Sequence, residues 1–399
     1  MDINRHLKVL DPLTTADTPE MAVSDLLETA HNEPIDIFDH SPPWRLYVRP
    51  VQTPGRTSQL LIAFSTSHAI ADGTSCLLFH QTFARALRDT DSLPSLVNGR
   101  LETHSTAEPS SPLEECATLP ISWSFLLSPL IGEYCPIWIK RALGVSTDNV
   151  SDSWSGASSR PARPTPSHPL RTGLKCAKIP SATTQHVLST CRAHGVRLTG
   201  LLIVLTSRAL AQKLQDRKQQ HRRFQAETAI DLRRQIQATQ GSMGNFPSAT
   251  TSALAVSDPL SKGMTSDDWS TASRVTDSLE EAAGSLSDQP VALLRYLSDF
   301  RGWTIRKSEQ PTNLSFSVSN VGMFKNGVGD ETENLSEMAF SQSADATGAP
   351  FNLNVVSTKT GPLSIVVTWW PGMLGVDDEG SFMTEVCGSI VEQLKEIGD

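Results

Sequence analysis

Residues 65–75 of this chain read STSHAIADGTS, and within them His68, Asp72 and Gly73 form the pattern H-x-x-x-D-G. The apolar run LLIAF at 60–64 precedes the pattern, and apolar residues recur at helical spacing after it. The sequence therefore predicts a buried strand, a turn that carries His68, and then a helix. Side chains in a turn at a strand end can face a cleft, so this turn is the first candidate for a functional site.

The residue types of this turn suit acid–base chemistry. A neutral imidazole can accept a proton near neutral pH, as a general base must. Asp72 could orient that imidazole, or it could pair with an arginine and hold the turn closed. Gly73 lets the backbone turn where a Cβ atom would clash. Two other interpretations stay open: a buried histidine satisfied by backbone groups, and a metal site made of His68, Asp72 and His80.

Length, charge and cysteine usage narrow the classes of function. The chain has 399 residues and a net charge of −9, from 34 Lys and Arg against 43 Asp and Glu. A net negative chain has no general attraction for nucleic acid or an anionic membrane, so no nucleic-acid partner is expected. The N-terminus does not resemble a signal peptide, and no apolar run is long enough to span a bilayer. Six cysteines without a CxxC pair favour a reduced, cytosolic compartment and no metal site.

Two halves are expected, and strands and helices alternate in both of them, which indicates an α/β or α+β fold. An N-terminal half over 1–144 and a C-terminal half over 173–399 are joined by the Ser/Pro-rich segment 145–172, expected to be an exposed linker. Polar stretches at 99–115 and 257–269 are expected to be loops. Strands are expected at 44–48, 59–65, 174–179, 224–232, 314–321, 351–357 and 363–370, and helices at 74–87, 181–193, 199–214, 291–305 and 382–397.

Four further motifs follow H-x-x-x-D-G along the chain: RAHGVRLTGLL at 192–202, AIDLRR at 229–234, MGNF at 243–246 and SVSNVG at 317–322. Together they resemble the chloramphenicol-acetyltransferase-like superfamily, which includes BAHD acyltransferases, alcohol O-acetyltransferases and peptide-synthetase condensation domains. The chain looks most similar to the fungal alcohol O-acetyltransferases. Ser67 stands where condensation domains usually carry a first histidine, and the DFGWG motif of plant BAHD enzymes is absent.

The resemblance implies a two-subdomain chloramphenicol-acetyltransferase-like fold, with mixed sheets, flanking helices and an active-site tunnel between the halves. It implies that His68 deprotonates a small-molecule alcohol or amine, which attacks an acyl thioester without forming a covalent acyl-enzyme. Acyl-CoA is then the expected co-substrate, with no permanently bound cofactor. A monomer is also expected.

The resemblance also assigns roles to other residues. Asp72 is expected to be structural and to pair with an arginine, for which Arg233 is the first candidate and Arg234 the second. Gly244-Asn245 is expected to be an ordinary turn. Candidates for the tunnel wall and for hydrogen bonding to an oxyanion are Ser317, Ser319 and Asn320.

Three features keep alternatives open. Only 67 residues precede His68, so the opening strand and helix of the family are expected to be missing or reduced. If that opening is missing, the chain could be a non-catalytic binding relative, which is one alternative. Ser67 and the absent DFGWG motif suggest a second alternative, a condensation or cyclisation enzyme that takes its substrate from a carrier protein. The apolar stretch 121–144 has three interpretations: core, an apolar acceptor site, or contact with a membrane surface.

Overall fold

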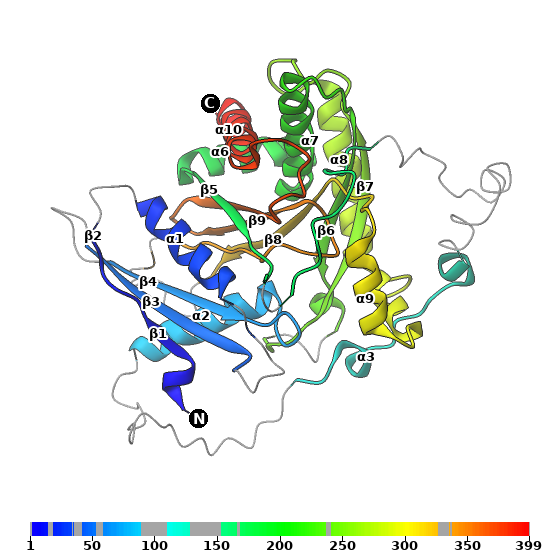
Figure 1. The fold of residues 1–399 in the computed structure, drawn as a ribbon. Helices are drawn as coiled ribbons and strands as arrows, with labels where there is room; N and C mark the ends of the chain where they lie inside the picture. Colours follow the sequence, from blue (N-terminus) through cyan, green and yellow to red (C-terminus); the bar gives the residue numbers. More distant parts are fainter. Residues whose placement is uncertain are drawn as a thin grey trace.

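The computed structural model describes residues 2–14, 19–33, 35, 42–52, 59–88, 110–127, 153–165, 168–236, 241–325, 335 and 337–398. Two mixed sheets with flanking helices make up the fold, as the sequence predicts (Figure 1). The smaller sheet belongs to the N-terminal half and the larger sheet to the C-terminal half. Helices from the N-terminal half lie between the two sheets.

The N-terminal sheet is built around β3 (Trp44–Gln52). β3 pairs antiparallel with β4 (Gln59–Thr66), and its other edge pairs in parallel with β1 (Leu7–Val9) and β2 (Leu13–Thr14). A short 3-10 helix, η1 (Ile3–Arg5), precedes β1. Two helices connect the sheets: α1 (Pro19–Asn32) contacts β3, β4 and β5 (Gly173–Ile179), and α2 (Gly73–Arg88) contacts β4 and β8 (Phe316–Phe324). The opening strand and helix are therefore present and not missing, although β1 has three residues and β2 has two. That this opening is reduced stays a prediction.

The C-terminal sheet has six strands in the order β5-β10-β9-β8-β6-β7. Its other strands are β6 (Arg223–Asp231), β7 (Pro247–Ala255), β9 (Phe351–Thr358) and β10 (Leu363–Trp369). β8 is parallel to β6 and β9, and the remaining pairs are antiparallel. The helical elements not yet named are α3 (Leu113–Cys116), α6 (Ser181–Ala193), α7 (Leu198–Asp216), η4 (Leu232–Gln235), α8 (Ser266–Ala283), η6 (Pro290–Tyr296), α9 (Phe300–Glu309) and α10 (Glu379–Gly398).

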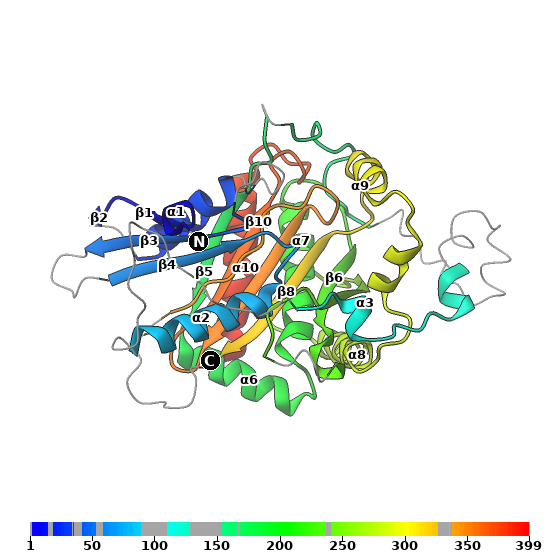
Figure 2. The same cartoon turned by 90° about the horizontal axis from the view of Figure 1, so that it is seen from below.

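The two faces of this sheet differ in polarity. In β9 the side chains of Phe351, Leu353 and Val355 join the main core, together with side chains from α6, α7, α8 and α10. Because side chains alternate along a strand, Asn352 and Asn354 point to the opposite face, where they are also buried. The apolar face therefore carries the core under the helices. The opposite face is the one that α2 of the N-terminal half crosses at β8 (Figure 2).

Most expected elements are confirmed within a few residues, but the helix expected at 291–305 is wrong. The chain forms η6 and then a separate α9, because the Asp299 side chain accepts a hydrogen bond from the backbone N–H of Gly302 and begins a new helix. The loop expected at 257–269 ends earlier than predicted. Thr265 and Asp268 form a capping box, so α8 begins at Ser266.

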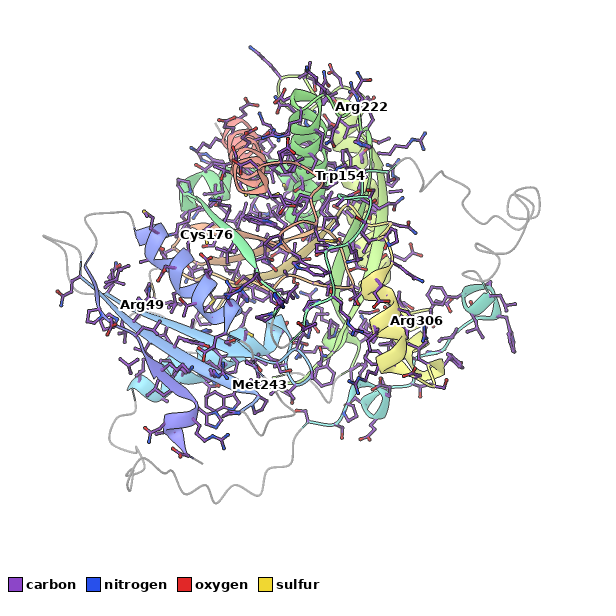
Figure 3. All side chains as sticks on the ribbon, in the orientation of Figure 1. Arg49, Trp154, Cys176, Arg222, Met243 and Arg306 are labelled. Carbon is purple, nitrogen blue, oxygen red and sulfur yellow. The ribbon has the colours of Figure 1, made fainter. Side chains whose placement is uncertain are left out.

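Part of the segment expected as an exposed linker packs into the C-terminal half. Trp154 lies inside the C-terminal half (Figure 3) and is 2 % exposed. Its ring lies against those of Phe351 and Phe382, with centroid distances of 6.4 and 6.5 Å. The Trp154 backbone N–H donates to the carbonyl of Arg223. The expectation of exposure is therefore wrong at Trp154, because one large aromatic ring gains enough from burial to anchor a Ser-rich segment. Residues 145–152 lie outside the described residues.

The apolar stretch 121–144 is described only as far as residue 127. Ile121 packs beside a small core cluster, whereas the Trp123 side chain is 77 % exposed. The interpretation as core therefore applies to Ile121 and fails at Trp123. Among the described residues, no helix combines the length and the apolar character needed to cross a bilayer.

Candidate active site

His68 lies in the turn between β4 and α2, as the sequence predicts. Its side chain is exposed and contributes to the wall of a cavity of about 1730 Å³. This cavity lies between the two halves and is lined by α1, β4 and α2 on one side and by β8 and residues 337–346 on the other. No described residue forms a hydrogen bond with the His68 ring. The interpretation of His68 as a buried, satisfied histidine is therefore wrong, and its ring nitrogens are available to a ligand.

Asp72 pairs with Arg233, the first of the two candidate arginines. The two carboxylate oxygens accept hydrogen bonds from Arg233 Nη1 and Nη2 at 2.7 and 2.9 Å, and both side chains are buried. Asp72 also accepts hydrogen bonds from the backbone N–H groups of Ser75 and Phe246. Arg234, the second candidate, is exposed. The Asp72 carboxylate is thus fully used in holding the turn to η4 at the end of β6, and it does not orient the imidazole.

The pKa of Asp72 reflects this ion pair. Burial favours the neutral acid, but the hydrogen bonds from Arg233, Phe246 and Ser75 outweigh burial and hold the pKa below its ordinary value. A carboxylate with a lowered pKa in the folded state stabilises the fold above its unfolded-state pKa, about 3.9. That contribution is lost as the pH falls through the lower, folded-state pKa.

A pH-dependent difference between the native protein and Asp72→Asn follows. We expect the native protein to have the larger free energy of unfolding at pH 7, and the difference to shrink steadily as the pH falls below about 4. Urea titrations of both proteins at pH 7, 5, 4 and 3 measure this. A difference that stays constant over this range would show that the Asp72 carboxylate is not the group that titrates.

Three further contacts hold the His68 turn in place. Thr74 Oγ1 donates to Asp231 Oδ2 at 2.9 Å, and Ser75 Oγ donates to the carbonyl of Gly244 at 2.8 Å. The amide nitrogen of Asn245 donates to the backbone carbonyl of His68 at 2.8 Å. The expectation that Gly244-Asn245 is no more than a turn is therefore wrong. Its position beside His68 depends on a contact across more than 170 residues of sequence, which no local pattern reveals.

Gly73 is needed for close packing rather than for an unusual backbone angle. It is the first residue of α2, and a Cβ atom there would lie 2.5 Å from Cγ1 of Val321 and 3.0 Å from Cζ of Phe340. The expected clash is therefore present, but it comes from the C-terminal half. Gly73 does not have a positive φ, so close packing and not the backbone conformation of the turn explains why this residue is glycine.

We expect Gly73→Ala to lower the free energy of unfolding by about 1–3 kcal/mol, because Val321 and Phe340 must move to admit the methyl group. Gly388→Ala in α10 is the matched control, since a Cβ there meets nothing within 4 Å. That control should be neutral or stabilising by up to about 1 kcal/mol. Equal denaturation midpoints for the two variants would contradict the close packing at Gly73.

The three candidates for the tunnel wall separate into two groups. Ser317 and Ser319 line the cavity, and Ser317 Oγ donates to Asn352 Oδ1. Asn320 instead bonds Thr199 Oγ1 at 3.0 Å and the backbone N–H of Gly322 at 2.9 Å, so its side chain is used to hold β8 to the start of α7. The structure therefore gives Asn320 a positioning role, and leaves the serines as groups that face a ligand.

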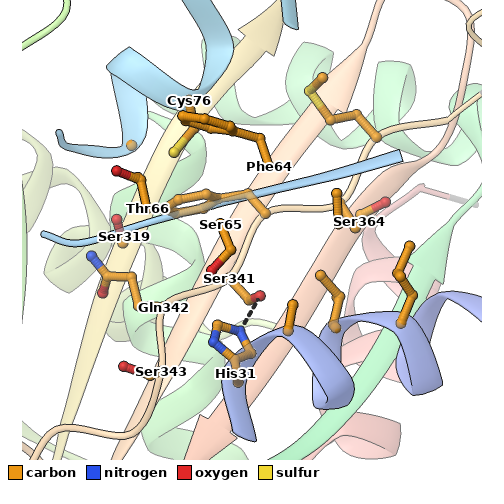
Figure 4. Close-up of a pocket in the computed structure, with 18 of the residues that line it drawn as sticks. His31, Phe64, Ser65, Thr66, Cys76, Ser319, Ser341, Gln342, Ser343 and Ser364 are labelled. Atoms are coloured by element: carbon orange, nitrogen blue, oxygen red, sulfur yellow. Dashed lines mark hydrogen bonds between the residues drawn. The ribbon is translucent and has the colours of Figure 1, made fainter. Parts of the chain in front are cut away.

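Sequence reasoning missed several polar residues that line the cavity. His31 at the end of α1 shares a hydrogen bond of 2.7 Å with Ser341 (Figure 4). Burial lowers the pKa of His31 and of His80 to about 4 and raises that of the Cys76 thiol to about 12. These three groups are therefore neutral near pH 7. The alternating Asn352 and Asn354 in an otherwise apolar strand are the signal that could have revealed the polar wall.

The described residues hold no group of three or more His, Cys, Asp or Glu side chains arranged to bind a metal ion. The metal site that the sequence left open would use His68, Asp72 and His80. Asp72 is instead paired with Arg233. The arrangement that remains is an exposed imidazole at the wall of a large cavity, on a turn held by a buried ion pair. Such an arrangement can transfer protons to and from a bound substrate.

A comparison with protein families matches residues 16–384 to the alcohol acetyltransferases. This chain belongs to the alcohol acetyltransferase family. Among curated proteins it is similar to the probable alcohol acetyltransferase FCK4 of Fusarium pseudograminearum, at 22 % identity over 91 % of this chain and 74 % of that protein. The family assignment confirms the resemblance read from the five motifs.

Solved structures support the fold of this alcohol acetyltransferase family member. The TRI3 trichothecene 15-O-acetyltransferase of Fusarium sporotrichioides has a TM-score of 0.61 at 12 % identity, with 98 % of this chain and 76 % of that one covered. The EpoB cyclization-docking bidomain of Sorangium cellulosum has a TM-score of 0.57 at 13 % identity, covering 98 % and 70 %. The likeness thus extends to peptide-synthetase domains of related fold.

Proposed function

We propose that this chain transfers an acetyl group from coenzyme A to a hydroxyl group of a small-molecule acceptor, with His68 as the general base. The observation that carries the proposal is the exposed His68 ring, which bonds to no described residue, at the wall of the cavity between the halves. The Asp72–Arg233 ion pair supports it, because it fixes the turn without occupying the imidazole. An amine is the alternative nucleophile.

The proposed reaction passes through one tetrahedral intermediate. A neutral ring nitrogen of His68 accepts the acceptor hydroxyl proton while the hydroxyl oxygen bonds to the thioester carbonyl carbon. The negative charge then rests on the former carbonyl oxygen, and the hydroxyl of Ser319 on the cavity wall is the candidate donor to it, because the Ser317 hydroxyl already donates to Asn352. Collapse of the intermediate breaks the C–S bond, and the imidazolium proton passes to the leaving thiolate. The products are the acetyl ester and free coenzyme A.

The size of the cavity supports a reaction with two substrates. Its volume of about 1730 Å³ exceeds the roughly 300–1,000 Å³ typical of a site for one small ligand. The polar wall on one sheet and the apolar side chains of α1 and α2 on the other side suit an acceptor with both kinds of surface. The proposal includes a monomeric enzyme in the cytosol with acyl-CoA as co-substrate and no permanently bound cofactor.

The test follows free thiol release from acetyl-CoA with a panel of alcohols and matched amines. We expect release that requires both substrates, and an intact mass after incubation with acetyl-CoA alone that shows no acetylated enzyme. Release only from a carrier-bound acyl group would instead support a condensation-type enzyme. Binding of acetyl-CoA or of an alcohol without any turnover would support a non-catalytic relative.

A further inference from the structure

One acidic side chain of the cavity wall, Glu227, has no partner among the residues that the structure describes. The cavity is lined by five described acidic residues, of which four have a side-chain ion pair or hydrogen bond: Glu33 with Lys8 and Tyr47, Asp72 with Arg233, Glu337 with Lys178, and Asp345 with Thr347. The fifth, Glu227, forms no hydrogen bond or ion pair with any described residue. A carboxylate in a partly buried wall has strong hydrogen-bonding capacity, so an unused one is available to a ligand.

The strand register places Glu227 in a polar row across the sheet. Glu227 of β6 is opposite Thr251 of β7 and Ser317 of β8, and Ser317 is opposite Asn352 of β9. Paired residues on neighbouring strands project on the same face, so this row lies on the polar face directed toward the cavity. Ser317 and Asn352 already bond to each other. Glu227 is thus the charged residue of this row, and its carboxylate oxygens accept no hydrogen bond from a described residue, so they can accept one from a ligand.

The same face connects this row to the His68 turn. Gly73, five residues after His68, packs against Val321 of β8, and Ser319 and Ser317 precede Val321 along the strand on the cavity side. Alternate residues of a strand are spaced by about 6.5–7 Å. An acceptor whose reacting hydroxyl is at His68 can therefore extend along β8 and present a second polar group to Glu227.

We propose that Glu227 accepts a hydrogen bond from a second hydroxyl group of the acceptor, so that the enzyme favours dihydric over monohydric alcohols. This inference rests on the proposed function and names the class of acceptor for that same site. Burial raises the pKa of Glu227, an effect that nearby Lys307 opposes and Asp345 strengthens. A hydroxyl donor from the acceptor would compensate for the water that the carboxylate has lost.

The test compares 1-octanol with octanediols that carry hydroxyls at positions 1,4, 1,6 and 1,8. In the native protein we expect at least one diol to have a kcat/KM about tenfold or more above that of 1-octanol. In Glu227→Leu this ratio should fall to near one, and in Glu227→Gln it should take an intermediate value. The matched control is Glu281→Leu, an exposed residue of α8 outside the cavity, which should keep the native ratio.

A binding measurement keeps the test independent of turnover. Without any acyl donor, the diol should raise the thermal midpoint of the native protein more than 1-octanol does, and the two should have equal effects on Glu227→Leu. Glu227→Gln should itself unfold at or above the native midpoint at pH 7, because it removes a charge from a site where burial disfavours one. An unchanged preference in Glu227→Leu, in rate or in thermal shift, would overturn the role of Glu227. A native protein that shows the shifts but no turnover would overturn the transferase instead.

Discussion

Replacing His68 by alanine is expected to lower kcat/KM for acetyl transfer about 100- to 10,000-fold. This range is the usual contribution of a positioned general base. Stability should hardly change, because the side chain is exposed and its ring bonds to no described residue. Steady-state thiol release at saturating acetyl-CoA, together with the urea midpoint of each protein, measures both effects.

Two controls make the result specific to the imidazole. His221→Ala removes a histidine outside the cavity and should leave the rate unchanged. Imidazole added to His68→Ala should restore part of the lost rate, because the space left by the side chain opens to the cavity. A rate for His68→Ala within a factor of three of the native rate would show that another group is the base.

Replacing Arg233 by methionine is expected to lower the free energy of unfolding by about 3–5 kcal/mol, because it leaves the Asp72 carboxylate buried without its counter-charge. The loss extends beyond the ion pair, since the Arg233 guanidinium also donates to Ser75 Oγ and the Gly244 carbonyl and lies 4.7 Å from the centre of the Phe246 ring. Acetyl transfer should fall as well, because the turn that carries His68 loses its attachment to the C-terminal half.

The neighbouring arginine supplies a matched control. Arg234 follows directly in the sequence but is exposed, so Arg234→Met should change stability by no more than about 0.5 kcal/mol. In the double variant Asp72→Asn with Arg233→Met, the buried charge is removed along with its partner. We expect that double variant to be more stable than Arg233→Met alone. Equal stabilities for Arg233→Met and Arg234→Met in urea titrations would contradict the buried ion pair.

The sequence predicted the turn that carries the site because the signals there are local. The apolar run of β4, the helical spacing in α2 and the H-x-x-x-D-G pattern lie within about 30 residues. It also predicted the partner of Asp72, but only through the resemblance of the motif at 229–234 to a family. Nothing in residues 229–234 alone distinguishes Arg233 from Arg234. Only the fold buries the first and exposes the second.

Other parts of the site depend on contacts that no local pattern encodes. Asn320 matched a family motif and was expected in the tunnel, yet it lies opposite Val355 on the core face of β8, away from Ser317 and Ser319, and its amide contacts Thr199. Trp154 lies in a Ser/Pro-rich segment and was expected to be exposed, yet it fills a space between Phe351 and Phe382. In both cases the contact partner comes from a distant element, Thr199 at the start of α7 for Asn320, and Phe351 and Phe382 for Trp154.

The sequence by itself determined the α/β or α+β class and the placement of His68 at the end of a strand, because strand and helix periodicity and turn chemistry act over short distances. The family came from the resemblance of the five motifs. Only the tertiary structure decided which polar groups share the cavity. Glu227, Ser317 and Asn352 come from three strands that are separated by up to about 125 residues in sequence and are brought level by sheet register. Register is set by packing of the whole apolar face under its helices, which is a global property of the chain.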